Sequence, residues 1–217
     1  MHDNTFMNQT MYRKMPTSEQ LPYALYTAEQ VRHFDRLSIE QYGIAGEELM
    51  QRAGQAAFEA MQKRWPEAKN ITVVTGSGNN AGDGFVVARL AVEAGLIVQI
   101  LQLADRNKFS EDAGRHASKF DAISDNYIDY EQLPQKTDVI VVAILGTGLH
   151  SPVYGIWHSV IETINQHQAP VFSHYIPYGL NADTVKVMVV AVRADMTFIF
   201  IGLKQGLFTG DGRDYCG

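Results

Sequence analysis

After a polar start, the chain alternates between short apolar runs and longer segments whose apolar residues recur every three or four positions. The short runs are rich in β-branched residues, which is typical of buried parallel strands, and the longer segments have helical spacing. Strands are predicted at 70–76, 96–103, 137–146, 169–176, 185–192 and 196–202. Helices are predicted between them at 83–95, 111–122 and 154–167. This order predicts an α/β fold, namely a three-layer Rossmann-like sandwich with a mostly parallel sheet and helices on both faces.

Two more helices are predicted before the first strand. The sequence "TAEQ" at 27–30 is a capping box, so a helix begins after Thr27 and continues to Gly43. A second helix fits 46–64 and ends before Pro66. We expect this N-terminal helical extension to pack on the sheet or to contribute to a subunit interface.

Size and composition fit one domain at 21–217 after a mobile lead-in at 1–20. The chain has 217 residues, of which 46% are apolar and 19% charged, with a net charge of −6. No block of Lys and Arg is present, which argues against a nucleic-acid partner. No apolar stretch approaches the roughly 18 residues of a membrane span. The one cysteine, Cys216, suits a reducing compartment, and we expect a cytoplasmic protein.

Three loops that follow predicted strands have an unusual composition. They read "GSGNNAGDG" (76–84), "GTGLHSP" (146–152) and "IPYGLNADT" (176–184). Ligands of open parallel sheets bind beyond the carboxyl ends of the strands, and glycine lets backbone amides approach an anion closely. Two such loops on neighbouring strands could hold a diphosphate and a nucleoside together. The alternative is that each glycine-rich loop is only a tight connection between a strand and a helix.

The first loop also matches a dinucleotide-binding fingerprint. "GSGNNA" has the form G-x-G-x-x-A, and Asp105 follows the next strand at the place of a ribose-binding acid. This match predicts an NAD(P)-dependent dehydrogenase. It is weak, because about 70 residues precede the strand and the second glycine loop is left unexplained.

Several longer motifs together carry a more specific resemblance. They are "ELMQRAG" (48–54), "GNNAGDG" (78–84), "LGTGL" (145–149), "IP-x-GLNADT" (176–184), "AVRAD" (191–195) and "FIGLKQGLFTGDGRDYCG" (200–217). From about Tyr26 to its end, the chain resembles the NAD(P)H-hydrate epimerase family, whose domain is also called YjeF N-terminal. The resemblance implies a doubly wound α/β fold and interconversion of the R and S forms of NAD(P)H hydrate, a cofactor-repair reaction. It also implies a fused or separate NAD(P)H-hydrate dehydratase, and often a homodimer.

The resemblance assigns two groups of residues to the substrate and some of them to potassium. Asn80 matches a potassium ligand of the family. The positions that match substrate-binding segments are Asn79, Asn80, Ala81, Gly82 and Asp83 in the first loop, and Gly146, Thr147, Gly148, Leu149, His150, Ser151 and Pro152 in the second. From the residues alone, Asp83 is either a structural helix cap or a contact to the sugar or nicotinamide.

Three positions depart from the family. Val142 and Tyr178 stand where the resemblance places potassium ligands, an Asp and a Ser, and Tyr175 stands where it places the catalytic Asp. Valine has no side-chain oxygen for a hard cation, and the ring of Tyr178 is large enough to obstruct the pocket. A phenol titrates near pH 10, far from an aspartate near 3.9, and the adjacent His174 should point to the opposite face of the strand. We therefore expect an impaired or inactive epimerase.

The origin of these three departures stays open at the level of sequence. They reflect an evolved loss of activity, a deliberate change or a divergent site for another ligand, or they are tolerated and activity persists. The main alternative function is a non-catalytic nucleotide-binding or regulatory module. Related domains of the family occur in an apolipoprotein-binding protein and in an RNA-decapping scaffold.

Overall fold

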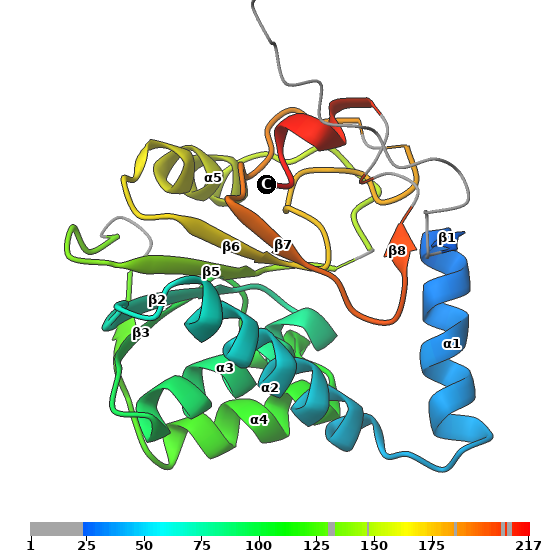
Figure 1. The fold of residues 1–217 in the computed structure, drawn as a ribbon, viewed down its shortest axis with the longest axis horizontal. Helices are drawn as coiled ribbons and strands as arrows, with labels where there is room; N and C mark the ends of the chain where they lie inside the picture. Colours follow the sequence, from blue (N-terminus) through cyan, green and yellow to red (C-terminus); the bar gives the residue numbers. More distant parts are fainter. Residues whose placement is uncertain (1–23, 130–132, 147, 185, 205–206, 208–209) are drawn as a thin grey trace, which may run out of the picture.

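Six parallel strands in the order β4-β3-β2-β5-β6-β7 form the central sheet (Figure 1). They are β2 (Asn70–Thr75), β3 (Ile97–Gln102), β4 (Tyr127–Ile128), β5 (Val139–Ala143), β6 (Val171–His174) and β7 (Met196–Phe198). The direction of strand order reverses between β2 and β5. The predicted parallel, Rossmann-like sheet is therefore confirmed, with its topological switch point between these two strands.

The computed structural model describes residues 24–129, 133–146, 148–184, 186–204, 207 and 210–217. The lead-in expected at 1–20 and Thr147 of the second glycine loop lie outside these residues.

Helices cover both faces of the sheet (Figure 1). One face carries α2 (Gly46–Arg64), α3 (Asn79–Glu93) and α4 (Glu111–Asp121), and the other carries α5 (Ile156–Gln166). The helical extension begins with α1 (Ala28–Glu40), which stands beside the sheet. No helix in the described part of the chain is long and apolar enough to cross a membrane.

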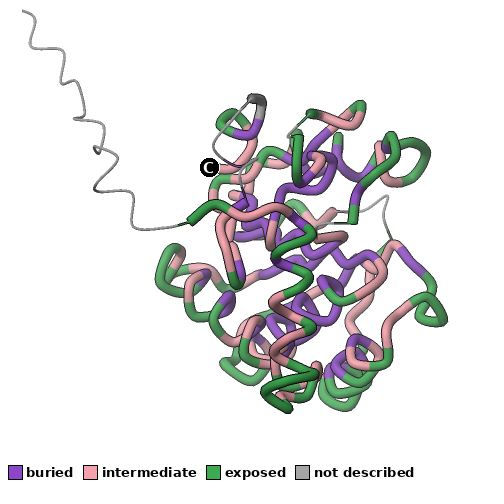
Figure 2. The backbone as a smooth tube through the Cα atoms, turned by 90° about the vertical axis from the view of Figure 1, so that its right-hand side faces the viewer, coloured by how far each residue is buried: buried purple, intermediate pink, exposed green. Residues whose placement is uncertain are grey.

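Alternation along the strands divides the core into two layers. Val73, Val141 and Phe172 face α2 and α3, whereas Val74 and Val142 face α5, and all five are buried. Successive side chains of a strand point to opposite faces, so strands covered on both sides are apolar throughout. The buried backbone accordingly runs through the middle of the molecule, with exposed segments around it (Figure 2).

The cap of α1 matches the prediction. The backbone N–H of Gln30 donates to the Thr27 hydroxyl at 3.2 Å, and the backbone N–H of Thr27 donates to the Gln30 side chain at 2.9 Å. Two otherwise unpaired N–H groups are thereby satisfied. Just before the cap, β1 (Leu25–Tyr26) pairs in parallel with β8 (Leu203–Lys204), a two-stranded sheet that the sequence did not predict.

The prediction of α3 at 83–95 was wrong at its start, because the helix begins at Asn79. Most of the first glycine loop is therefore helix, held in place by close packing. A Cβ at Gly82 would lie 2.1 Å from the Met50 sulfur, and one at Gly84 would lie 2.6 Å from the Cβ of Ala143. At Gly84 the Cβ of Ala143 cannot move aside, and at Gly82 the end of the Met50 side chain would have to shift, so tertiary packing overrides the weak helix propensity of the segment.

The strand predicted at 185–192 is absent from its described part, 186–192. Its backbone bonds to two different loops instead of a strand, since the Met188 N–H donates to the Gly179 carbonyl and the Val153 N–H donates to the Met188 carbonyl. Val189 has a φ of 84°, which is incompatible with a strand. The apolar side chains that suggested a strand pack against the core instead. Met188 and Val190 are partly buried against the hydrophobic cluster beneath α5.

The strain at Val189 gives a testable expectation. A β-branched residue at positive φ costs on the order of 1–3 kcal/mol, whereas glycine adopts this conformation freely at a small cost in unfolded-state entropy. Val189→Gly should raise the free energy of unfolding by about 1 kcal/mol in urea titrations. The matched change Val187→Gly, at a residue without positive φ that packs on the core, should lower it. Destabilisation by both changes would contradict the assignment of strain to Val189.

Candidate functional site

A cavity of about 310 Å³ opens beyond the carboxyl ends of β2 and β6. Its walls come from α1, α2, the first turns of α3, the start of α4 and the segments that follow β6 and β7. Its size is at the low end of small-molecule sites, which span roughly 300–1,000 Å³. Lining residues include Asp35, Met50, Asn79, Asp83, Tyr175 and Phe200.

The first glycine segment divides into pocket and packing residues. Asn79 and Asp83 line the pocket, whereas Ala81 and Gly82 are buried between helices. Asp83 is the fifth residue of α3, so the cap interpretation was wrong, and the N-cap position belongs to Gly78. Burial, and to a lesser extent the charge of Asp35, raises the pKa of Asp83 well above its usual range. Burial thus favours the protonated form of the Asp83 carboxyl in the cavity.

Tyr175 follows β6 directly and forms part of the pocket wall. Its φ of 64° is a left-handed conformation that non-glycine residues rarely adopt. Its ring lies 4.8 Å from that of Phe200, and a Cβ at Gly146 would approach the Tyr175 Cγ to 3.6 Å. Burial, with the charges of Asp83 and Asp35, raises the pKa of the Tyr175 phenol well above 10. A phenol in this state is a poor proton acceptor near neutral pH.

His174 does not point away from Tyr175, contrary to the sequence expectation. Both rings contact the ring of Phe200, at 5.8 Å for His174 and 4.8 Å for Tyr175. The alternation fails because the strand ends at His174 and the positive φ of Tyr175 turns the chain. His174 is fully buried, and neither ring nitrogen has a hydrogen-bond partner among the described residues. Burial lowers its pKa to about 3, so the imidazole is neutral and serves as packing.

The second glycine loop only borders the pocket. Gly146 lies next to Tyr175, since a Cβ on it would be 3.6 Å from the Tyr175 Cγ, but none of the described residues of this loop lines the cavity. Leu149 is buried in the core beneath α5, and its carbonyl accepts a hydrogen bond from the Asn181 side chain at 3.2 Å. The other described residues of the loop are exposed, namely Gly148, His150, Ser151 and Pro152. The ring of Tyr175 therefore lies between the cavity and the start of the second loop.

The positions that the resemblance assigns to potassium do not form a cation site. Val142 is buried in the α5-side core, and Tyr178 packs there with its ring 5.9 Å from that of Trp157. Tyr178 thus does not obstruct the cavity, contrary to expectation. Asn80 keeps a buried side-chain amide without a hydrogen-bond partner in the described part of the chain. The Asn80 amide oxygen, with a buried valine and a packed phenol at the other two positions, does not provide the oxygen shell that a hard cation requires.

Two pocket-side residues were missed from the sequence. Asp35 of α1 lines the cavity, and Lys204 of β8 is fully buried with its Nζ 4.8 Å from the centre of the Tyr175 ring. The Lys204 ammonium donates one long hydrogen bond, 3.4 Å, to the Phe200 carbonyl. Burial lowers its pKa to about 8 against the favourable charge of Asp35. The available signals were a carboxylate beside Phe34 on the apolar face of α1 and a lysine inside an apolar run.

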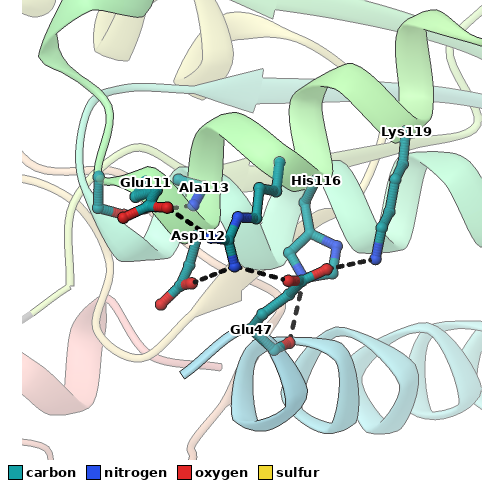
Figure 3. Close-up of polar contacts among 8 residues, drawn as sticks. Glu47, Glu111, Asp112, Ala113, His116 and Lys119 are labelled. Atoms are coloured by element: carbon teal, nitrogen blue, oxygen red, sulfur yellow. Dashed lines mark hydrogen bonds and ion pairs between the residues drawn. The ribbon is translucent and has the colours of Figure 1, made fainter. Parts of the chain in front are cut away.

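Ion pairs hold the α2 wall of the pocket to α4 (Figure 3). The Glu47 carboxylate accepts hydrogen bonds from Lys119 at 2.6 Å and from Arg115 at 3.1 Å. These bonds lower the pKa of Glu47. The Glu47 backbone carbonyl lies 3.1 Å from Nε2 of buried His116. The network fixes the start of α2, from which Leu49 and Met50 reach the pocket.

Comparisons with known proteins agree on one family. The profile described as "YjeF-related protein N-terminus" matches residues 46–206. A bifunctional NAD(P)H-hydrate repair enzyme of Coxiella burnetii is 42% identical over 89% of this chain and 40% of its own length. An NAD(P)H-hydrate epimerase of Limosilactobacillus fermentum is 39% identical over 88% of this chain and 92% of its own. The chain thus spans less than half of the bifunctional relative and nearly all of the single-function one.

A solved structure supports the fold alone. The yeast protein ynu0 superposes with a TM-score of 0.71 at 21% identity, covering 80% of this chain and 79% of its own.

Buried His174 makes stability depend on pH. Its pKa is about 3 in the folded chain and about 6.5 when unfolded, so the unfolded state binds a proton first as the pH falls. The contribution is fully present above pH 6.5 and is lost progressively as the pH falls from 6.5 towards 3. Between pH 6.5 and 5 the free energy of unfolding should drop by about 2 kcal/mol through this group.

The measurement is urea unfolding of the chain and of His174→Phe at both pH values. The phenylalanine variant should lack this part of the drop, because it has no group to protonate. His158→Phe, at a half-exposed histidine of α5, should keep it. Equal pH dependence in the chain and in His174→Phe would show that His174 is not the source.

Proposed function

The chain belongs to the family of YjeF-related protein N-termini, and from that premise we propose that its pocket binds NAD(P)H hydrate but epimerises it poorly. The hydrated nicotinamide would occupy the cavity between α1, α2 and α3. The exposed second glycine loop, which begins beside Tyr175, would receive the phosphates. The names of the relatives support this substrate class.

The observation that carries the proposed loss of activity is the state of Tyr175. Its phenol stands in the pocket wall where the resemblance places a catalytic aspartate, and its pKa is raised rather than lowered. Epimerisation at the hydrated carbon needs a group that takes and returns a proton near neutral pH. Buried Lys204 contacts the ring of Tyr175, but the pKa of the phenol is still shifted upward, so the contact does not convert the phenol into a base.

The potassium of the family enters no step of this proposal. The positions that would hold it are occupied by Val142 and Tyr178, both built into the core. Binding would then rest on Asn79, Asp83 and the apolar walls, and it should not depend on potassium.

The second candidate is a non-catalytic nucleotide-binding or regulatory module. The observation in its favour is that the cavity persists although the catalytic and cation positions are lost. The dehydrogenase alternative has less support, because Asp105 follows β3 as an exposed residue that does not line the cavity. In the epimerase proposal, a dehydratase, fused or separate, consumes the product, in line with the bifunctional relatives.

The direct test is conversion of purified S-NADH hydrate to the R form, followed by chromatography with and without potassium. The triple variant Val142→Asp, Tyr175→Asp, Tyr178→Ser should turn over faster than the chain by on the order of 10²–10⁴, because it regains an ionised acid/base group. Its rate should rise with potassium, which the two restored oxygen ligands would bind.

Tyr154→Asp serves as the control, since Tyr154 is 65% exposed and the change adds a carboxylate outside the cavity. This variant should leave the rate unchanged. Thermal unfolding would check that the triple variant is folded, because Val142→Asp puts a carboxylate into an apolar core. If the chain as it stands is as fast as a folded triple variant, the proposed impairment is wrong.

A further inference from the structure

Three carboxyl groups line the same cavity, each from a different helix. One of them, Asp112 of α4, forms an ion pair with Arg115 at 3.9 Å. Asp35 belongs to α1 and Asp83 to α3, and both line the pocket. Neither carboxylate has a hydrogen bond or ion pair with any described residue, although Asp83 is only 3% exposed. Asp35 is half-buried. Because buried polar groups normally have partners, the unpartnered carboxyl of Asp83, with that of Asp35 at the same cavity, points to a ligand that supplies a partner.

The surroundings make these two groups selective. The neighbouring wall residues are largely apolar and include Leu49, Met50, Ala53 and Phe200. In such surroundings a hydrogen bond is strong, and an unpaired polar or charged group is costly. The ligand atoms that face the two carboxyls must therefore match them in number and in hydrogen-bonding character.

The two carboxyls have different proton affinities. Burial raises the pKa of Asp35, but the buried ammonium of Lys204 partly opposes that shift. Burial and the charge of Asp35 both raise the pKa of Asp83. Of the two groups, Asp83 is therefore protonated more readily and is the better donor, while Asp35 is the better acceptor.

We propose that Asp35 and Asp83 together recognise a primary carboxamide and reject the corresponding carboxylate. The amide NH₂ would donate to Asp35, and the amide carbonyl would accept from Asp83. This inference rests on the proposed function, since the carboxamide is that of the nicotinamide ring. A carboxylate in the same place offers no donor to Asp35 and adds a negative charge beside it.

Two cations near the pocket do not reverse this preference. Lys204 lies against the ring of Tyr175, with its Nζ 4.8 Å from the ring centre, donates to the Phe200 carbonyl and does not line the cavity. Arg52 lies at the cavity, but its side chain is 62% exposed and pairs with Glu48 at 2.7 Å. It is therefore solvated and already neutralised, and it offers little to an acid bound deeper in the cavity.

The test compares two dinucleotides that differ only at this group, NADP⁺ and its nicotinic acid analogue, by titration calorimetry on the full chain. The chain should bind the amide at least tenfold more tightly. In Asp35→Asn, the ratio should fall below about threefold, because an asparagine side chain can both donate and accept. Asp125→Asn removes the same charge at an exposed residue between α4 and β4, and it should keep the tenfold ratio.

The outcomes separate the inference from the proposed function. Equal affinity for both dinucleotides in the unmodified chain overturns the inference and leaves the proposed function standing. Binding of neither overturns both. If the Asp35→Asn variant still prefers the amide by tenfold, Asp35 does not recognise the carboxamide, and the proposal is wrong for this residue. Nicotinamide and nicotinic acid, titrated separately against the unmodified chain, give the same comparison without a variant that must fold.

Discussion

The location of the pocket depends on how closely α3 approaches its neighbours. Glycines at 82 and 84 let the helix lie so close to Met50 of α2 and Ala143 of β5 that a side chain at either position would clash. This contact starts the helix at Asn79 instead of leaving an open glycine loop. It also directs Asn79 and Asp83 at the cavity, so the chemistry of the site follows from a packing constraint.

The same dense packing explains why the three residues that depart from the family, Val142, Tyr175 and Tyr178, affect the pocket differently. Val142 and Tyr178 lie on the α5 side of the sheet and have become part of its core. Tyr175 lies on the other side, where its ring joins Phe200 and Lys204 and forms the wall between the cavity and the second glycine loop. The cavity therefore survives all three residues, while the acid/base function associated with position 175 does not fit a phenol of raised pKa.

Sequence patterns predicted the parts of the fold that local rules control. The capping box at Thr27, the apolar strands and the parallel arrangement all follow from nearest-neighbour spacing. Three features could not be predicted from local spacing, because they depend on contacts between residues far apart in the sequence. The early start of α3 depends on Met50 and Ala143, and the loop around Val189 depends on carbonyls and N–H groups of two other loops. The roles of Asp35 and Lys204 become visible only when α1 and β8 are placed beside Tyr175.

The pairing of β1 with β8 has a consequence for how the molecule is made. Leu25 pairs with Leu203, so the first segment must wait for one that is synthesised much later. Contacts between such distant positions carry a large loop-closure cost and form late. Strands β2 to β6 end by His174 and can pair first, whereas the wall that α1 contributes can close only after synthesis has passed residue 204. The nascent chain therefore acquires its scaffold before its binding site.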